Sequence, residues 1–257
     1  MTHPTPYPEV NAVLHALLKG VQTVLGTQLV GLYLYGSLSS GDFNLETSDI
    51  DFVVITEGAL NAETVTALEA MHVQIAEVGG KWARKLEGSY IPRADLPRYD
   101  PDGGPYPGIN EGEFSVGGHG SDWIIQRHIL RAGGVAVTGP DIRQWIDPVA
   151  PDDLRRAVRG ILREWWAPIA ADPVWLHERS DYQAFAILTM ARALHALHHG
   201  DIASKPVAAR WARDNLPAPW PALVETALAW HYGVELHLVA ETAAFIRYTL
   251  ARSAAIG

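Results

Sequence analysis

The run LYLYGSLSSGDFNLETSDIDFVVIT, residues 32–56, constrains the fold and chemistry of this chain more than any other segment. It places a turn, Gly36-Ser37, after one apolar stretch and the sequence Asp49-Ile50-Asp51 at the start of the next. Because side chains alternate between the two faces of a strand, the two aspartates are predicted to share one face while the isoleucine turns toward the core. Two carboxylates on one face can bind a hard cation, beside a turn whose backbone can approach a phosphate closely.

A plainer interpretation exists for the same residues. Gly-Ser is common in turns, and residues 48–51 can form a solvated strand edge in which Ser48 only closes the loop. The context favours the binding interpretation, because both pieces adjoin β-rich apolar runs, residues 30–35 and 52–55, and a Gly-, Ser- and Asn-rich connection joins them.

Gly36-Ser37 followed by Asp49-Ile50-Asp51 resembles the nucleotidyltransferase motif of the DNA polymerase β type, in which two aspartates hold magnesium against a nucleoside triphosphate. A second stretch, ILTMARALHALHHGDIASKPVAARW at residues 187–211, resembles the C-terminal helical domain of the streptomycin/spectinomycin adenylyltransferases. The resemblance extends over nearly the whole chain. It implies an α+β protein: an N-terminal nucleotidyltransferase (polymerase β-like) domain at residues 1–150, then an all-helical bundle domain at 151–257. A cleft between two such domains is the expected ligand site.

Composition limits the class of protein. A chain of 257 residues with 48% hydrophobic content can form one large or two modest cores. No apolar run is long enough for a bilayer, the N-terminus lacks the features of a signal peptide, and there are no cysteines, so we expect a cytoplasmic protein. The formal charge of −9 argues against a nucleic-acid partner and suits a cationic substrate.

Apolar spacing predicts helices over residues 9–26 and 62–75, and a third strand over residues 85–92. Residues 93–120 are rich in Pro, Gly and Asp and are predicted to be a loop. The rest is predicted to be mostly helical, in segments 121–132, 152–167, 181–199, 205–215, 219–230 and 234–251. Gly200 suits a helix C-cap, Ser204 an N-cap and Pro206 a first helical turn.

A third acid, Glu87, lies on the predicted third strand. In a nucleotidyltransferase sheet this strand would run beside the strand of Asp49 and Asp51, and in the resembled adenylyltransferases a glutamate on it is the general base. That role is chemically sensible, because a carboxylate can accept the proton of a hydroxyl as it attacks the α-phosphorus. The alternative is a surface glutamate paired with Lys85. Whether Glu87 also binds a second metal ion stays open.

The resemblance implies that ATP is a co-substrate and that Mg²⁺ is held by Asp49 and Asp51. It also implies nucleotide-binding roles for residues from both halves of the chain: Gly36, Ser37, Ser48, Arg192, Lys205 and Tyr232. A lysine at a helix start opposes the helix dipole, and an anionic ligand there would relieve that conflict. Arg192 could instead form a salt bridge within its helix.

For the acceptor, the resemblance implies tryptophans and acids against a polycationic sugar, which points to Trp123, Trp175, Glu178 and Asp181. Each tryptophan has core packing as its alternative, since aromatic residues dominate buried surfaces. His195 and His199 lie one helical turn apart and could chelate zinc, but no third ligand is evident, and a partly exposed helix face is the preferred interpretation.

These features together predict magnesium-dependent transfer of AMP from ATP to a hydroxyl of an aminoglycoside-type antibiotic, streptomycin and/or spectinomycin, with release of pyrophosphate. The alternatives are a nucleotidyltransferase with another small-molecule or protein acceptor, and a non-catalytic ATP-binding module. Retention of Asp49, Asp51 and Glu87 together favours the enzyme, because a binding module has no need of a base.

Overall fold

The computed structural model describes residues 4–78 and 80–255. The chain divides into two compact units, Met1–Pro148 and Val149–Gly257. Across the described ranges, no helix combines the length and the apolar character that crossing a membrane requires.

The first unit is built on a sheet whose six described strands are ordered β5-β4-β3-β2-β1-β6. Strands β2 and β3 run parallel, and every other neighbouring pair is antiparallel. The strands are β1 (Leu29–Leu34), β2 (Ile50–Thr56), β3 (Leu86–Pro92), β4 (Tyr106–Asn110), β5 (Glu113–Gly117) and β6 (Val135–Thr138).

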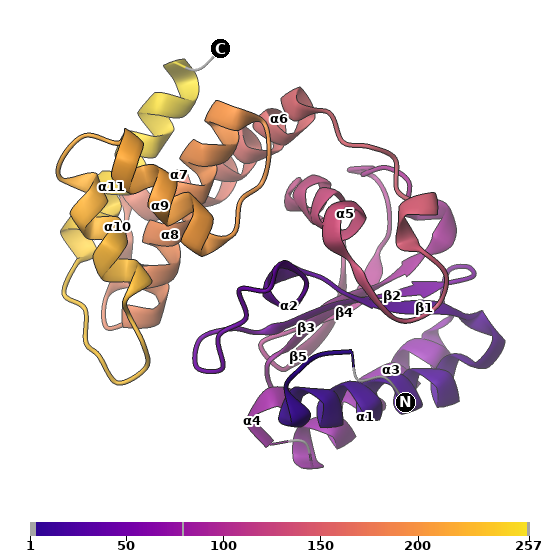
Figure 1. Cartoon of the computed structure of the whole chain (residues 1–257). Helices are drawn as coiled ribbons and strands as arrows, with labels where there is room; N and C mark the ends of the chain where they lie inside the picture. The colour runs from indigo at the N-terminus through magenta and orange to yellow at the C-terminus, as the bar shows by residue number, and fades with distance from the viewer. Residues whose placement is uncertain (1–3, 79, 256–257) are drawn as a thin grey trace. The chain divides into compact units, whose positions relative to one another are not determined.

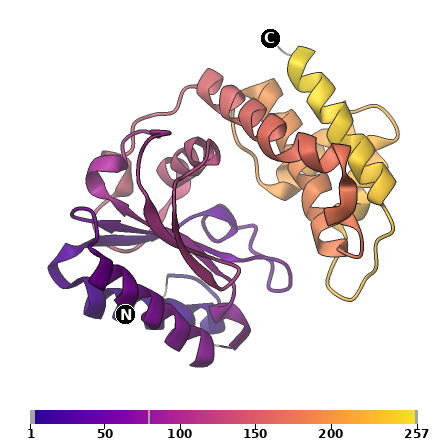
Figure 2. The same cartoon turned by 180° about the vertical axis from the view of Figure 1, so that it is seen from behind.

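Helices cover both faces of this sheet (Figures 1 and 2). On one face, α1 (Pro8–Leu25), α3 (Ala62–Val78) and α4 (Gly80–Ala83) pack over alternate residues of the central strands, such as Phe52 and Tyr90. On the other face, α5 (Asp122–Gly133) packs over the intervening residues. The parallel β2–β3 pair is therefore covered on both sides, as its near-continuous apolar sequence requires.

The prediction of a loop over residues 93–120 was wrong. That region holds a 3₁₀ turn, Arg93–Asp95, and the hairpin of β4 and β5. The hairpin reverses at Glu111-Gly112, where both residues have positive φ (49° and 83°), as a tight two-residue turn requires. Prolines and glycines within these short strands concealed their pattern, and the four-residue strand β6 was also not predicted.

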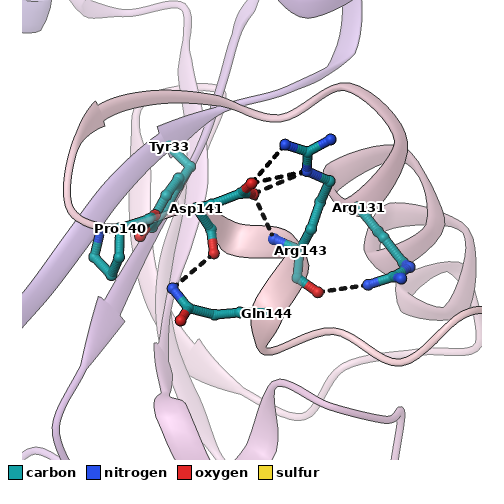
Figure 3. A network of polar contacts seen from close by, with 6 residues as sticks. All are labelled: Tyr33, Arg131, Pro140, Asp141, Arg143 and Gln144. Carbon is teal, nitrogen blue, oxygen red and sulfur yellow. Dashed lines mark hydrogen bonds and ion pairs between the residues drawn. The ribbon is translucent and has the colours of Figure 1, made fainter.

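A polar network fastens the segment after β6 to the sheet and to α5 (Figure 3). Tyr33 on β1 donates its hydroxyl to the carbonyl of Pro140 at 2.8 Å, and burial, reinforced by Asp141, raises the Tyr33 pKa to about 12. Arg131, near the end of α5, donates to the carbonyls of Arg143 and Ile146 at 2.5 and 2.6 Å. Helix α5 is thereby held at its C-terminal end.

The second unit is helical throughout its regular elements. Its α-helices are α6 (Pro151–Ile161), α7 (Ala167–Ala171), α8 (Ser180–His199), α9 (Lys205–Asn215), α10 (Trp220–Leu228) and α11 (Val239–Ala255).

Two expected helices of this unit differ from the structure. The single helix expected over 152–167 is interrupted by a π turn, Leu162–Trp166, which buries Trp166 and leaves Trp165 59% exposed. The last helix begins at Val239, not at residue 234.

The predicted caps around α9 are only partly confirmed. Gly200 adopts the left-handed conformation at the end of α8, and Pro206 lies in the first turn of α9. Ser204 occupies the N-cap position, but its buried hydroxyl makes no hydrogen bond within the described chain. Its backbone, not its side chain, therefore marks the start of the helix.

Candidate active site

The predicted pair of aspartates and the third acid, Glu87, lie at the start of two neighbouring strands in the structure. Strands β2 and β3 run parallel with Asp51 opposite Glu87, and Asp49 lies just before β2. Ile50 is fully buried among the core residues on the opposite face. The expectation that β3 runs beside the strand of the two aspartates is confirmed, and three carboxylates belong to one end of a parallel strand pair.

The short helix α2 (Gly36–Ser40) begins at Gly36, next to Asp51. Its φ is +64°, and a Cβ on it would overlap the Oδ2 atom of Asp51. The backbone N–H of Tyr35 donates to the carbonyl of Asp51 at 3.1 Å, which fixes the turn beside β2. Both the backbone conformation and the space therefore require glycine here.

Glu87 carries a strongly perturbed carboxyl. Burial, followed by repulsion from Asp49, Asp51 and Glu111, raises the pKa of the Glu87 carboxyl to about 8, against the opposing influence of Lys85. A carboxyl with a pKa near the working pH can accept a proton and release it again, which is what general base catalysis requires.

Lys85 forms an ion pair with Asp49. Its Nζ lies 3.0 Å from Oδ1 of Asp49 and donates to the carbonyl of Ser48 at 3.2 Å. The Ser48 hydroxyl accepts the backbone N–H of Asn44 at 3.0 Å. Ser48 thus performs the loop-closing role of the plainer interpretation, and its hydroxyl hydrogen can still serve as a donor.

Sequence reasoning missed three residues of this region. Tyr35 is buried, and burial followed by Asp51, Glu87 and Asp122 raises the pKa of its hydroxyl well above the ordinary value. Asp122, the first residue of α5, therefore lies on the same side of the sheet as the catalytic candidates. Glu111, the third, stands in the β4–β5 turn, and its acidic character in a turn-like sequence carried no signal of its own.

Trp123 belongs to an aromatic stack, not to an open surface. Its indole lies parallel to the imidazole of His119, with ring centroids 3.7 Å apart and an interplanar angle of 7°. Tyr106 covers the same imidazole at 4.2 Å, and the guanidinium of Arg127 lies 5.8 Å from the indole. The substrate role expected for Trp123 stays a prediction, and one face of its indole is already stacked on His119.

In the second unit, the expected nucleotide contacts fall on α8, α9 and the segment before α11. Arg192 donates its Nε to the carbonyl of Ala203 at 3.0 Å, and Lys205 lies 5.7 Å from the ring centroid of Phe185. Tyr232 is 56% exposed and its ring contacts Trp230 at 5.0 Å.

The expected acceptor contacts surround the start of α8. Trp175 is 63% exposed, and Glu178 has a positive φ of 58°. Both oxygens of the Asp181 carboxylate accept hydrogen bonds from Arg179 at 3.1 Å, and this pairing lowers the Asp181 pKa. A cationic acceptor would have to compete with Arg179 for that carboxylate.

The three histidines at the end of α8 surround the indole of Trp211, at centroid distances of 5.6 to 5.9 Å. His198 and His199 are exposed. Within residues 4–78 and 80–255, no three His, Cys, Asp or Glu side chains are grouped as a ready-made metal site.

Asp49 and Asp51 nevertheless suit a nucleotide-bound magnesium ion. Carboxylate oxygens are the donors that this hard cation prefers, and a nucleotide supplies further oxygens from its phosphates. Repulsion from Asp49, Asp51 and Glu111 adds to burial in raising the pKa of the Glu87 carboxyl, and Lys85 opposes it. A divalent cation would relieve that repulsion.

Comparison with known proteins agrees with this arrangement. Residues 16–89 match the family model "Nucleotidyltransferase domain", and residues 144–252 match "Aminoglycoside adenylyltransferase, C-terminal domain". A spectinomycin 9-adenylyltransferase from Staphylococcus aureus is 29% identical over 231 residues, covering 84% of this chain and 83% of the relative. An aminoglycoside (3'') (9) adenylyltransferase from Shigella flexneri is 26% identical over 238 residues, covering 86% of each chain.

A solved structure shares the fold. A spectinomycin adenyltransferase from Enterococcus faecialis, crystallised with ATP and spectinomycin, superposes with a TM-score of 0.74 and 18% identity. The match covers 95% of this chain and 98% of that one.

Proposed function

Because this chain belongs to the aminoglycoside adenylyltransferase family, we propose that it transfers AMP from ATP to a hydroxyl of an aminoglycoside-type antibiotic and releases pyrophosphate. The protein is a nucleotidyltransferase, and spectinomycin and streptomycin are the acceptors to test first.

One observation carries this proposal furthest: Glu87 lies directly opposite Asp51 on a parallel strand, and its carboxyl has a pKa of about 8. A module that only binds ATP does not need a carboxyl whose pKa is raised to near neutral pH. A transferase that must deprotonate a hydroxyl does.

In the proposed reaction, the ionised Glu87 carboxylate accepts the proton of the acceptor hydroxyl. The hydroxyl oxygen forms a bond to the α-phosphorus, and the bond between that phosphorus and the bridging oxygen of pyrophosphate breaks. The pyrophosphate carries away the electron pair of the broken bond. The chain's contribution is position and a local charge, as is general for phosphoryl chemistry.

Asp49 and Asp51 would hold Mg²⁺ in the ATP-bound enzyme. Such an ion neutralises negative charge on the triphosphate when it is bound. Asp49 would have to exchange its Lys85 partner for the ion, so Lys85 regulates how readily this carboxylate is available.

The remaining assignments are proposals of the same kind. Gly36 lets the turn approach a phosphate, and Ser37 offers a hydroxyl and an amide beside it. Arg192, Lys205 and Tyr232 are proposed to bind the nucleotide, and they are supported by their places in the family's C-terminal segment. Trp123, Trp175, Glu178 and Asp181 are proposed to contact the acceptor.

The test incubates the purified protein with Mg²⁺ and ATP, with and without spectinomycin or streptomycin. Pyrophosphate release and the mass of the drug are measured together. We expect a gain of one adenylyl group that is lost in Glu87→Gln and in Asp51→Asn. ATP hydrolysis or binding without any modified drug would contradict an aminoglycoside acceptor.

A further inference from the structure

Two histidines, the buried His72 and the half-buried His119, hydrogen-bond to adjacent residues of β3 on opposite faces of the sheet. His119 Nε2 lies 2.9 Å from the hydroxyl of Ser89, and His72 Nε2 lies 2.7 Å from the hydroxyl of Tyr90. Ser89 and Tyr90 are neighbours on a strand, so their side chains point to opposite faces. Tyr90 and His72 lie on the α1 and α3 side, whereas Ser89 lies on the face of Glu87.

The Ser89 bond connects two parts of the candidate site. Ser89 is two residues from Glu87, so the side chains of both project from the same face of β3. His119 lies three residues before Asp122 and four before Trp123, in the glycine-rich sequence Gly117–Gly120 that leads into α5. The bond therefore joins the strand of the proposed base to the start of the helix that carries Asp122.

His119 makes further contacts that hold this glycine-rich segment. Its ring lies between Tyr106 and Trp123, and its carbonyl accepts the hydroxyl of Tyr99 at 3.2 Å. A Cβ on either Gly117 or Gly118 would meet nothing within 4 Å. The imidazole therefore supplies side-chain contacts to a segment whose glycines have no side chains of their own.

The hydrogen bonds around His119 indicate which nitrogen of its imidazole carries the proton. The Ser89 hydroxyl also lies 3.2 Å from the carbonyl of Pro107, and its single hydrogen satisfies that carbonyl. Ser89 then accepts the Nε2–H of a neutral imidazole. The buried Nδ1 atom makes no hydrogen bond in the described chain, so a protonated ring would leave a buried charge without an acceptor.

We propose that His119 is a positioning residue: its neutral imidazole fixes the start of α5 to β3 through Ser89, and so holds Asp122 and Trp123 in place relative to Glu87. This inference rests on the proposed adenylyl transfer. Its direct structural consequence, the fixed start of α5, can be measured without any acceptor.

The experiment compares the two histidine hydrogen bonds to β3. His119→Phe keeps the stacked ring and removes the hydrogen bond, and Ser89→Ala removes the partner. Both are expected to lower kcat by about ten- to hundredfold with the KM for ATP changed less than about twofold, because small misplacements of reacting groups are costly. The double variant is expected to lower kcat no further than either single substitution does, since both substitutions break the same hydrogen bond. His119→Gln, which keeps a donor at similar reach, is expected to recover part of the rate.

His72→Phe is the matched control, because it breaks the equivalent bond on the opposite face of β3. It is expected to lower the melting temperature while leaving kcat within about twofold of wild type. Hydrogen–deuterium exchange is measured in parallel. His119→Phe and Ser89→Ala are expected to speed exchange in residues 117–124, and His72→Phe to leave those residues unchanged.

The outcomes are distinguishable. If His119→Phe and Ser89→Ala both keep the kcat of the wild type, the positioning role of His119 is refuted. A wild type that adenylylates no aminoglycoside would overturn the proposed function, and the exchange measurement would still decide the inference: unchanged exchange at 117–124 would refute it.

Discussion

The carboxylate of Asp51 occupies the space in which a side chain on Gly36 would begin. Gly36→Ala therefore forces a methyl group against Asp51 and strains a backbone that has φ at +64°. We expect kcat/KM to fall by at least about a hundredfold, in line with displacement of a positioned catalytic group.

Gly41 provides the control for this substitution. It also has a positive φ, +79°, but a Cβ there would meet nothing within 4 Å. Gly41→Ala is expected to cost about 1 kcal/mol of stability and to leave kcat/KM nearly unchanged. Equal losses of activity in both alanine variants would show that backbone strain, not the contact with Asp51, is responsible.

Glu87→Gln should stabilise the protein at alkaline pH while abolishing turnover. The folded-state pKa of Glu87 is about 8, against an ordinary value of 4.5. As pH rises from 4.5, the unfolded chain ionises first, so stability is lost progressively until about pH 8. The glutamine variant lacks this loss, and we expect it to be more stable by roughly 2 to 4 kcal/mol at pH 8.

Urea unfolding at pH 4 and pH 8 measures this difference, which should vanish at the lower pH. Glu113→Gln, at an exposed carboxylate of β5, controls for the change in net charge. A glutamine variant no more stable than wild type at pH 8 would contradict the raised pKa.

Lys85→Met should tighten the binding of Mg²⁺ in the absence of nucleotide. The substitution frees Asp49 and removes a positive charge from a cluster of carboxylates. A unit charge a few ångströms away in a well-solvated site is worth about 1 kcal/mol, so we expect a roughly three- to tenfold lower dissociation constant by calorimetry.

Lys81→Met makes the same change in net charge at an exposed lysine that lies over the Trp82 ring. It should leave magnesium affinity unchanged. If both variants bind Mg²⁺ equally well, the effect comes from net charge and not from the Asp49 partner.

The His72–Tyr90 pair predicts sensitivity to acid. Burial lowers the His72 pKa from 6.5 to about 4, so its contribution to stability is fully present above pH 6.5 and is lost as pH falls toward 4. Replacing both residues by phenylalanine should remove this loss, roughly 2 kcal/mol between pH 7.5 and 4.5. Tyr90→Phe alone keeps the histidine and should retain the sensitivity, as seen in urea midpoints at the two pH values.

The main elements of the candidate site could be predicted from the sequence because strong local patterns encode them. The alternation at residues 49–52 predicts that the two aspartates share one face, and the pattern after Lys85 predicts β3. The pairing of β2 with β3 came from the family resemblance, since no local pattern says which strands are neighbours.

The missed features depend on contacts between distant segments. Glu111 affects Glu87 because β4 pairs antiparallel with β3, with Gly88 opposite Ile109, so the turn after β4 lies near Glu87. Pro and Gly in these strands obscured the pattern. The ion pair of Lys85 with Asp49 and the bond of His119 with Ser89 likewise follow from the assembled sheet. Such side-chain partnerships are not encoded within any single window of sequence.

The π turn at Leu162–Trp166 makes this part of the helical unit tolerant of a one-residue change in sequence length. A residue added or removed within an α-helix rotates everything that follows by about 100°. Trp165 and Trp166 lie within the stretch where that rotation is absorbed. A π turn accommodates one extra residue within a helix, so deletion of one residue here is expected to restore a regular α-helix and to keep α7 in register with α6.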